Sequence, residues 1–503
     1  MNLYHLGISN MNQLFTRQET IFQSLQITLL FLLFYKALNF IRNVIFARFL
    51  GPEEFGILTL YLMIIYIIKS AATFGIGAAY TRYTPHFRSR QSLKFFFGRT
   101  FLCGSFCITS TALLVWLFSR PIAQTVFQNP DIRTGVVSTI FVIVPFAFLE
   151  LYRGALQGLQ NFRARSILEL SCSALFMIFG SLSALIAARA QSVVWAMAGT
   201  YILVVAVFSW YFWSGLTTQP EKPQSDTESD FFKRLFSFCL FIFLMDISLH
   251  IYQFVDRFML SQFLSNEAIG IYTSCLTMTG MIFPIGLILG DVLLPNLSAL
   301  WAQGKVDEGQ AKFYYHVKLL LITFLLCAIL LLALKKHLII FLFGRPYLDG
   351  VQITPTLITF QVYHSIFWVL AVVPLLVEQT HLLFFITLSG IIINATLNCL
   401  LIPLVGMIGA ALGAMSAAIA MAVTIILILY SKFRRVDIGL FLLLLSPLLN
   451  LLDRIYINIV FSMAILFLVL GTNFVFSTKE KELFRNHVNT YGRSLIGYLL
   501  PSK

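Results

Sequence analysis

Charge is scarce in this chain. Of its 503 residues, 11% are charged and 58% are hydrophobic, and the mean hydropathy is +0.85. Soluble domains carry roughly 25% charged residues, so the composition excludes a soluble globular protein. Many apolar runs approach or exceed the roughly 20 residues that a helix needs to cross a bilayer. Because the alternating segments of about ten residues that form transmembrane barrels are missing, the composition predicts an all-α polytopic membrane protein.

Motifs for catalysis and metal binding are missing as well. The chain has no P-loop, no HExxH, no CxxC pair and no Asp-x-Asp, so neither ATP hydrolysis, a metal site nor nucleotide-sugar transfer is indicated. No loop exceeds about 20 residues, which is too short for a folded aqueous domain. The seven cysteines all lie in apolar segments and are expected to be packing residues. We therefore expect a protein that is not an enzyme and that uses no cofactor or metal.

The net charge of +13 could indicate nucleic acid binding, but the positions of the basic residues argue otherwise. They concentrate in loops that a cytoplasmic N-terminus would place inside, such as residues 81–99 with Arg82, Arg88 and Lys94. Cytoplasmic loops of membrane proteins carry this excess of Lys and Arg. We therefore expect no nucleic acid partner, an even number of spans, and both termini in the cytoplasm.

The chain contains an internal repeat. The segment LGPEEFGILT, which starts at Leu50, returns 214 residues later as LSNEAIGIYT, which starts at Leu264. Hydropathy predicts about 14 transmembrane helices, and the offset corresponds to six of them, so both copies cross the membrane in the same direction. Such a parallel repeat implies a pseudo-twofold axis along the membrane normal. We predict two six-helix lobes followed by two C-terminal helices.

The clearest boundary is the polar segment at residues 217–233, whose Pro, Ser and acidic residues are typical of linkers. It separates six predicted spans from eight. The predicted organisation is an N-terminal lobe (1–216), a cytoplasmic linker (217–233), a C-terminal lobe (234–435), two additional helices (436–476) and a cytoplasmic tail (477–503).

Basic and amide side chains share one face of the first predicted helix. Successive residues turn by about 100°, which places these four on that face: Lys36, Asn39, Arg42 and Asn43. Lys69 lies within the second span. Each cation near the middle of the membrane costs roughly 2.5–3.5 kcal/mol on insertion scales. A water-filled cavity or an anionic partner would remove most of that cost, and snorkelling towards the interface is the alternative.

The corresponding helix of the second copy, the seventh predicted span, carries acidic and titratable residues instead. Under the 214-residue offset, His250 takes the place of Lys36. Asp256 likewise takes the place of Arg42. One hypothesis is that the first lobe holds an anionic head group while the second lobe handles a coupling ion.

Four residues are candidates for ion coupling: Asp246, His250, Asp256 and Asp291. The alternative is an internal salt bridge that only stabilises packing, between Asp246 and His250 or between Asp256 and Arg257. The residues themselves leave both interpretations open.

Charged residues at the ends of the fourth and fifth predicted spans have a simpler interpretation. Glu150 and Arg153 lie at the cytoplasmic end of the fourth span, and Glu169 enters the fifth. We expect these residues to form ion pairs at the membrane interface.

Five segments, in this order, resemble the polysaccharide-flippase family. They are ARFLGPEEFGILTLY from Ala47, GALQGLQNF from Gly154, FVDRFMLSQFLSNEAIGIYTS from Phe254, FLFGRPYLDG from Phe341 and NATLNCLLIPLVGMIGAALG from Asn394. The family includes exporters of O-antigen, exopolysaccharide and teichuronic-type polymers, some of them for lipopolysaccharide. It belongs to the superfamily that also holds multidrug extruders and peptidoglycan-precursor flippases.

This resemblance implies a V-shaped bundle of 12–14 helices in the cytoplasmic membrane of a bacterium or archaeon. Such a protein moves a polyprenyl-pyrophosphate-linked oligosaccharide from the inner to the outer leaflet by alternating access, often coupled to protons or sodium. The implied partners are this lipid, the membrane lipids, and polysaccharide polymerase or chain-length proteins. The family's cationic cavity corresponds here to four basic residues: Lys36, Arg42, Lys69 and Arg257. Asn39 and Asn43, on the same helix face as Lys36 and Arg42, complete the predicted substrate-binding residues.

Three other functions compete with this one. A multidrug-type exporter would favour carboxylates in the first lobe, whereas this first lobe is cationic. A membrane enzyme acting on the same lipid would need a sizeable outer loop, and the loops here are short. A scaffold for the polysaccharide machinery is the third, and only the cations within the helices argue against it.

Overall fold

The computed structural model describes residues 21–89, 92–217, 228–377, 379–433, 438–452, 454–472, 475–476 and 480–482. Most of the predicted linker at 217–233 and of the predicted tail at 477–503 lies outside these residues. The helices are α2 (Ile21–Thr73), α3 (Ile76–Ser89), α4 (Leu93–Leu117), α5 (Ser119–Phe127), η1 (Pro130–Ile132), α6 (Arg133–Gly158), α7 (Phe162–Ala187), α8 (Ala190–Thr217), α9 (Glu228–Phe263), α10 (Asn266–Thr279), α11 (Phe283–Ala302), α12 (Val306–Leu342), η2 (Arg345–Gln352), α13 (Thr354–Leu370), α14 (Val372–Leu376), α15 (Thr380–Val405), α16 (Met407–Phe433), α17 (Ile438–Leu445), η3 (Ser446–Leu452) and α18 (Ile455–Gly471).

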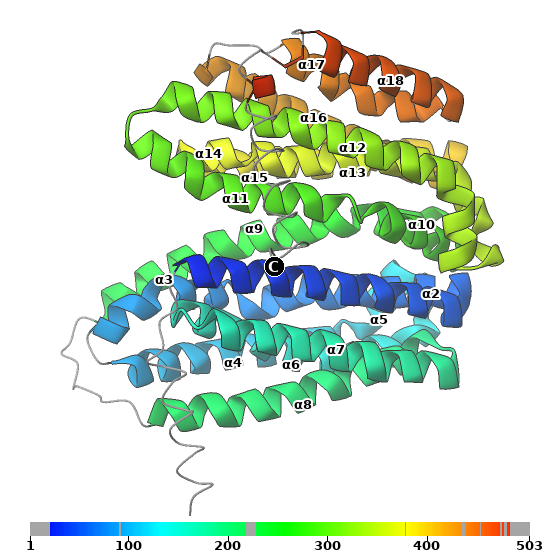
Figure 1. Cartoon of the computed structure of the whole chain (residues 1–503). Helices are drawn as coiled ribbons and strands as arrows, with labels where there is room; N and C mark the ends of the chain where they lie inside the picture. The colour runs from blue at the N-terminus through cyan, green and yellow to red at the C-terminus, as the bar shows by residue number, and fades with distance from the viewer. Residues whose placement is uncertain are drawn as a thin grey trace, which may run out of the picture. The chain divides into compact units, whose positions relative to one another are not determined.

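Every element in the described part of the chain is helical (Figure 1). Eleven of these helices are long and apolar enough to cross a membrane, and shorter apolar helices follow near the end of the chain. The first of the eleven contains two predicted spans, because α2 is interrupted at Gly51. The prediction of an all-α polytopic protein is confirmed.

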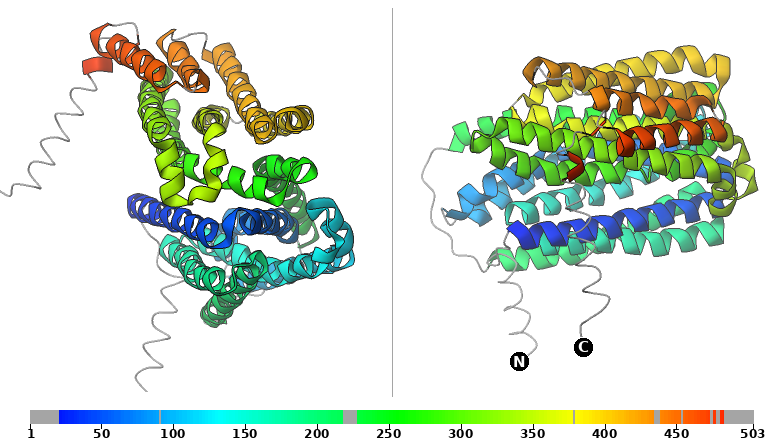
Figure 2. Two further views of the ribbon diagram at one scale, coloured as in Figure 1. Left: turned by 90° about the vertical axis from the view of Figure 1, so that its right-hand side faces the viewer. Right: turned by 45° about the horizontal axis from the view of Figure 1, so that its top comes forward.

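The helices form two compact units. The first consists of Met1–Thr277, Ile339–Gly350 and Ile391–Gly413, and the second of Met278–Leu338, Val351–Gly390 and Ala414–Lys503. In the first unit, α2 packs against α6, α7, α8 and α9, and α3 packs against α6 (Figure 2). In the second unit, α11 packs against α13 and α14, and η3 contacts α13, α17 and α18. The division into six-helix lobes at residues 217–233 stays a prediction.

Both copies of the repeat have the same backbone plan, a helix, a break and a second helix. In α2 the break is Gly51, whose φ of 75° lies in the left-handed region that glycine tolerates. Pro52 then starts the second arm, as proline does at the first position of many helices. In the second copy α9 ends at Phe263 and α10 begins at Asn266. Asn266 lies 214 residues after Pro52, so the breaks coincide.

The two copies also touch each other through a reciprocal glycine contact. A Cβ atom on Gly56 would overlap the backbone carbonyl oxygen of Asn266, and one on Gly270 would overlap that of Pro52. Gly270 lies 214 residues after Gly56, so each copy presents the same residue to the same backbone position of the other. Only residues without a side chain allow this approach. The geometry is that of a pseudo-twofold contact, as the parallel repeat predicts.

The FLFGRPYLDG segment holds the end of the first copy. The Tyr347 hydroxyl donates a 2.6 Å hydrogen bond to the carbonyl oxygen of Ala47, and Arg48 Nη1 donates one of 2.8 Å to the carbonyl oxygen of Phe341. Burial raises the pKa of the Tyr347 phenol, so this hydroxyl stays a donor. Gly350 of the same segment lies against Cys275 of α10. One segment therefore contacts both copies of the repeat.

Candidate functional site

Three basic residues lie on the first arm of α2, residues 21–50: Lys36, Arg42 and the exposed Arg48. Lys36 and Arg42 are both partly buried. Arg42 donates a 3.3 Å hydrogen bond from Nη2 to Oδ1 of Asn43, and its guanidinium carbon lies 4.9 Å from the ring centroid of Phe176. Among the residues that the structure describes, neither Lys36 nor Arg42 forms an ion pair. No carboxylate in that part of the chain therefore neutralises their charges.

Asn39 lies between these two cations in the sequence, and its amide group forms hydrogen bonds within the protein. Its Nδ2 donates a 2.9 Å hydrogen bond to the carbonyl oxygen of Tyr35. Its Oδ1 accepts one of 3.3 Å from the Ser173 hydroxyl of α7. Asn39 thus joins α2 to α7 and holds the arm that carries Lys36 and Arg42.

Lys69, on the second arm of α2, has a different environment. It is only 6% exposed, and its Nζ lies 3.9 Å from Oε2 of Glu150 on α6. The ammonium group also lies 5.5 Å from the ring centroid of Phe146. A carboxylate and an aromatic face both favour a buried cation. The cost of burying Lys69 is therefore offset inside the protein.

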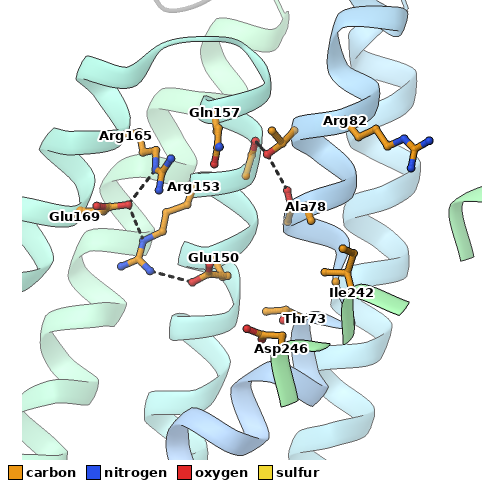
Figure 3. Close-up of a pocket in the computed structure, with 14 residues that line it drawn as sticks. Thr73, Ala78, Arg82, Glu150, Arg153, Gln157, Arg165, Glu169, Ile242 and Asp246 are labelled. Carbon is orange, nitrogen blue, oxygen red and sulfur yellow. Dashed lines mark hydrogen bonds and ion pairs between the residues drawn. The ribbon is translucent and has the colours of Figure 1, made fainter. Parts of the chain in front are cut away.

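The Glu150 carboxylate begins a chain of ion pairs between α6 and α7. Arg153 Nη1 lies 2.9 Å from Glu150 Oε2, and Arg153 Nε lies 3.8 Å from Glu169 Oε1. Arg165 Nε donates a 3.1 Å hydrogen bond to the same Glu169 oxygen. Figure 3 shows the Arg153 side chain reaching between the two glutamates. The expected ion pairs are present, and they form one connected network.

These side chains also line a cavity of about 460 Å³ in the first unit, to which α2, α3, α6, α7 and α9 all contribute. Its remaining charged residues are Arg82 of α3 and Asp246 of α9. Three basic residues therefore face three acidic ones: Arg82, Arg153 and Arg165 against Glu150, Glu169 and Asp246. Arg82 extends away from the ion-paired side chains in Figure 3.

Close helix packing forms one wall of this cavity. A Cβ atom on Gly154 of α6 would overlap the backbone of Gly77 on α3. The two helices can therefore approach each other backbone to backbone, which brings their neighbouring polar residues together. The spacing of Gly154 and Gly158 in GALQGLQNFRAR was a signal of this packing, but nothing in the sequence showed that a cavity lies beside it.

Asp246 and His250 lie together where α9 meets α2. The Ser70 hydroxyl donates a 2.5 Å hydrogen bond to Asp246 Oδ2. His250 Nδ1 lies 2.9 Å from the backbone carbonyl oxygen of Asp246 and 3.6 Å from its Oδ1. The imidazole ring stacks on Tyr66 with 6.0 Å between the ring centroids. Asp246 thus combines an internal pairing with a place in the cavity wall.

Asp256 and Arg257 are paired inside the protein. Asp256 is 4% exposed and accepts a 2.7 Å hydrogen bond from the Tyr272 hydroxyl and one of 2.8 Å from the Arg257 N–H. Arg257 Nη1 lies 3.8 Å from Asp256 Oδ1 and donates to the carbonyl oxygen of Gln253. This is the internal salt bridge that the sequence left open as an alternative.

The last coupling candidate, Asp291, lies apart in the chain. It is on α11, in the second unit, and its side chain is exposed. In the part of the chain that the structure covers, no three His, Cys, Asp or Glu side chains are grouped so that they could hold a metal ion.

Comparison with known families decides the affiliation. A family described as "Polysaccharide biosynthesis protein" matches residues 45–352, well over half of the chain. The chain belongs to this family. The resemblance seen in the five sequence segments is thereby confirmed. The comparison with curated proteins finds no match.

Several solved structures share the fold of this polysaccharide biosynthesis protein. They include a flippase and multidrug transporters. A lipid II flippase MurJ in an inward-closed conformation has a TM-score of 0.68 and 15% identity, covering 88% of this chain and 98% of its own. An inward-facing multidrug resistance MATE family transporter has a TM-score of 0.60 and 12% identity, covering 79% and 96%. A transporter of the same MOP superfamily from Pyrococcus furiosus, described as having a binding pocket of reverse polarity, has 0.52 and 12%, covering 82% and 95%. These likenesses show a shared fold.

Proposed function

We propose that this protein is a flippase that moves a polyprenyl-pyrophosphate-linked oligosaccharide from the inner to the outer leaflet by alternating access. Membership of a polysaccharide biosynthesis family and the fold shared with a lipid II flippase both support this function. Its setting would be the cytoplasmic membrane of a bacterium or archaeon, with polysaccharide polymerase and chain-length proteins as partners.

The uncompensated charge of Lys36 and Arg42 is the observation that carries the proposal. The protein offsets its other deeply placed cations, since Lys69 faces Glu150 and Arg257 faces Asp256. Leaving two cations unpaired in a transmembrane helix costs roughly 2.5–3.5 kcal/mol each. A pyrophosphate offers the missing negative charge, and guanidinium and ammonium groups both bind phosphate well.

The chemistry of the cargo explains why a protein is needed. A charged, hydroxyl-rich head group loses its hydration in hydrocarbon, at a cost of several kcal/mol for each unpaired polar group. Polar side chains inside the helical bundle replace that hydration, and aromatic rings offer apolar faces to sugar rings. The polyprenyl tail stays in the bilayer throughout. No covalent bond is made or broken.

Ion coupling is proposed for Asp246 and His250. Asp246 lies in the cavity wall and shares Ser70 with His250, so a proton or sodium ion bound there would alter a contact between α9 and α2. Such a contact is a suitable element for linking an ion gradient to alternation between two states.

The experiment that tests the flippase proposal removes the two cations in turn. Lys36→Ala and Arg42→Ala, produced at normal levels in the membrane, should each lower surface polysaccharide at least tenfold and leave the lipid-linked precursor in the inner leaflet. Arg120→Ala is the matched control, because Arg120 is an exposed cation on α5. Normal export by both variants would refute the role of these cations.

A multidrug-type exporter is the second candidate function. It is favoured by the fold shared with MATE transporters and by the carboxylates Glu150, Glu169 and Asp246 in the cavity wall, which suit a cationic drug. Drug efflux that survives Arg42→Ala but is lost in Glu150→Gln would favour this second function. The flippase proposal expects the opposite sensitivity to Arg42.

A further inference from the structure

The charged cavity differs from the first arm of α2 in its charge balance. Its wall holds three basic and three acidic side chains, of which Arg153, Arg165, Glu150 and Glu169 are joined in one ion-paired network. A site with compensated charges has no net attraction for a dianion such as pyrophosphate. Lys36 and Arg42, by contrast, have no carboxylate partner in the described part of the chain, and Arg42 has only aromatic faces and the Asn43 amide oxygen beside it. The two regions therefore suit different parts of one ligand.

The ion-paired groups still have free hydrogen-bonding capacity. Arg153 donates to Glu150 from Nη1 and Arg165 donates to Glu169 from Nε, so each guanidinium keeps further N–H donors. Each carboxylate can accept about four hydrogen bonds, and each guanidinium can donate five. The Gln157 amide, also in the wall, adds both a donor and an acceptor.

Fixed donors alternating with fixed acceptors match the hydroxyl groups of a sugar, because each hydroxyl both donates and accepts. Five of the six charged side chains are about one fifth to two fifths exposed, and the sixth, Arg82, is exposed, so a ligand can reach them. The cavity volume of about 460 Å³ lies within the roughly 300–1,000 Å³ of small-molecule sites.

We infer that this cavity is the sugar-binding subsite of the flippase, which holds an uncharged, hydroxyl-rich part of the head group, while Lys36 and Arg42 hold the pyrophosphate. The inference rests on the proposed function. Gln157, Arg153 and Glu169 are then specificity-determining residues. Asp246 connects this subsite to the proposed coupling pair, because it lies in the cavity wall and contacts His250.

A binding competition separates the two subsites. The full-length protein in lipid nanodiscs is offered two probes, bare polyprenyl pyrophosphate and the same lipid carrying the repeat unit isolated from the host cells. Native mass spectrometry then measures how much of each lipid is bound. We expect the wild type to prefer the glycosylated lipid at least tenfold.

Two cavity variants test the assignment. Gln157→Ala removes an amide that takes part in no ion pair, and Glu169→Gln keeps the shape of a side chain whose charge it removes. Each should lower the preference for the glycosylated lipid at least fivefold. Gln157→Ala should leave binding of the bare lipid unchanged, whereas Glu169→Gln, which leaves the cavity one positive charge in excess, should not weaken it. Retained binding of the bare lipid also shows that each variant is folded. Gln124→Ala, exposed on α5, is the control and should keep the full preference.

The other outcomes are decisive as well. An unchanged preference in both cavity variants, or a wild type that binds the two lipids equally, would overturn the sugar subsite and leave the flippase proposal standing. A wild type that binds neither lipid would instead count against the flippase itself. Lys36→Ala should weaken both lipids by the same factor, because both carry the pyrophosphate.

Discussion

The two copies of the repeat have one backbone plan and opposite electrostatics. Both break at the same register, at Gly51 in α2 and after Phe263 in the second copy, and both bring a glycine to the backbone of the other. Yet Arg42 of the first copy lies against the ring of Phe176, while Asp256, at the equivalent place, is satisfied by Tyr272 and Arg257.

This difference separates the residues that the fold requires from the residues that the proposed binding function requires. A backbone-to-backbone contact between the copies excludes any side chain, so glycine is needed on both sides. The charged positions of the two helices do not take part in that contact, and they can diverge without changing the fold. In our proposal the first copy binds the anion and the second copy handles the coupling ion.

The largest loss of stability is expected from breaking the buried ion pair between Asp256 and Arg257 in the second copy. Asp256→Ala leaves Arg257 without its carboxylate, and breaking a buried pair in this way costs roughly 3–5 kcal/mol. Arg42→Ala, at the equivalent place, loses aromatic contacts worth about 1 kcal/mol and a 3.3 Å hydrogen bond to Asn43, but leaves no buried charge behind. Thermal unfolding of the two variants in detergent measures the contrast. Equal losses of stability would mean that the copies do not differ in this respect.

At the glycine contact, by contrast, equivalent substitutions in the two copies should cause equal losses of stability. Gly56→Ala and Gly270→Ala each place a methyl group against a backbone carbonyl, and such overpacking costs roughly 1–3 kcal/mol. We expect the two losses to be similar, as judged from the unfolding midpoints. Gly199→Ala, where a Cβ meets nothing within 4 Å, is the control and should not destabilise. A loss in one copy alone would contradict a twofold contact.

The smallest change in stability is expected for Asp246→Asn, because the amide oxygen can still accept the Ser70 hydrogen bond. Its effect should appear in transport, as a loss of dependence on the proton or sodium gradient. Flipping assays in vesicles with and without each gradient measure this, and Asp307→Asn, at an exposed position at the start of α12, serves as the control. A gradient dependence equal to that of the wild type would remove Asp246 from the coupling site.

Ion pairs between residues close in sequence could be predicted more readily than ion pairs between residues far apart in sequence. Asp246 and His250 are four residues apart, so a helix brings them together whatever its neighbours are. Asp256 and Arg257 are adjacent in the chain. Lys69 and Glu150 are far apart in sequence, and only the packing of α2 against α6 makes them partners. Lys69 was therefore assigned to a cationic cavity from its depth and from the family resemblance, whereas the structure places it beside a carboxylate.

Hydropathy and the positions of the basic loops by themselves determined that this is a helical membrane protein, and five short segments resembled the family of polysaccharide biosynthesis proteins to which it belongs. These properties are additive along the chain or local to a few residues, so no neighbour in space is needed to recognise them. The tertiary structure alone decided which cations are neutralised and where a cavity remains. Both depend on how α2, α3, α6, α7 and α9 pack, because an ion pair or a cavity wall is made by residues that only folding brings together.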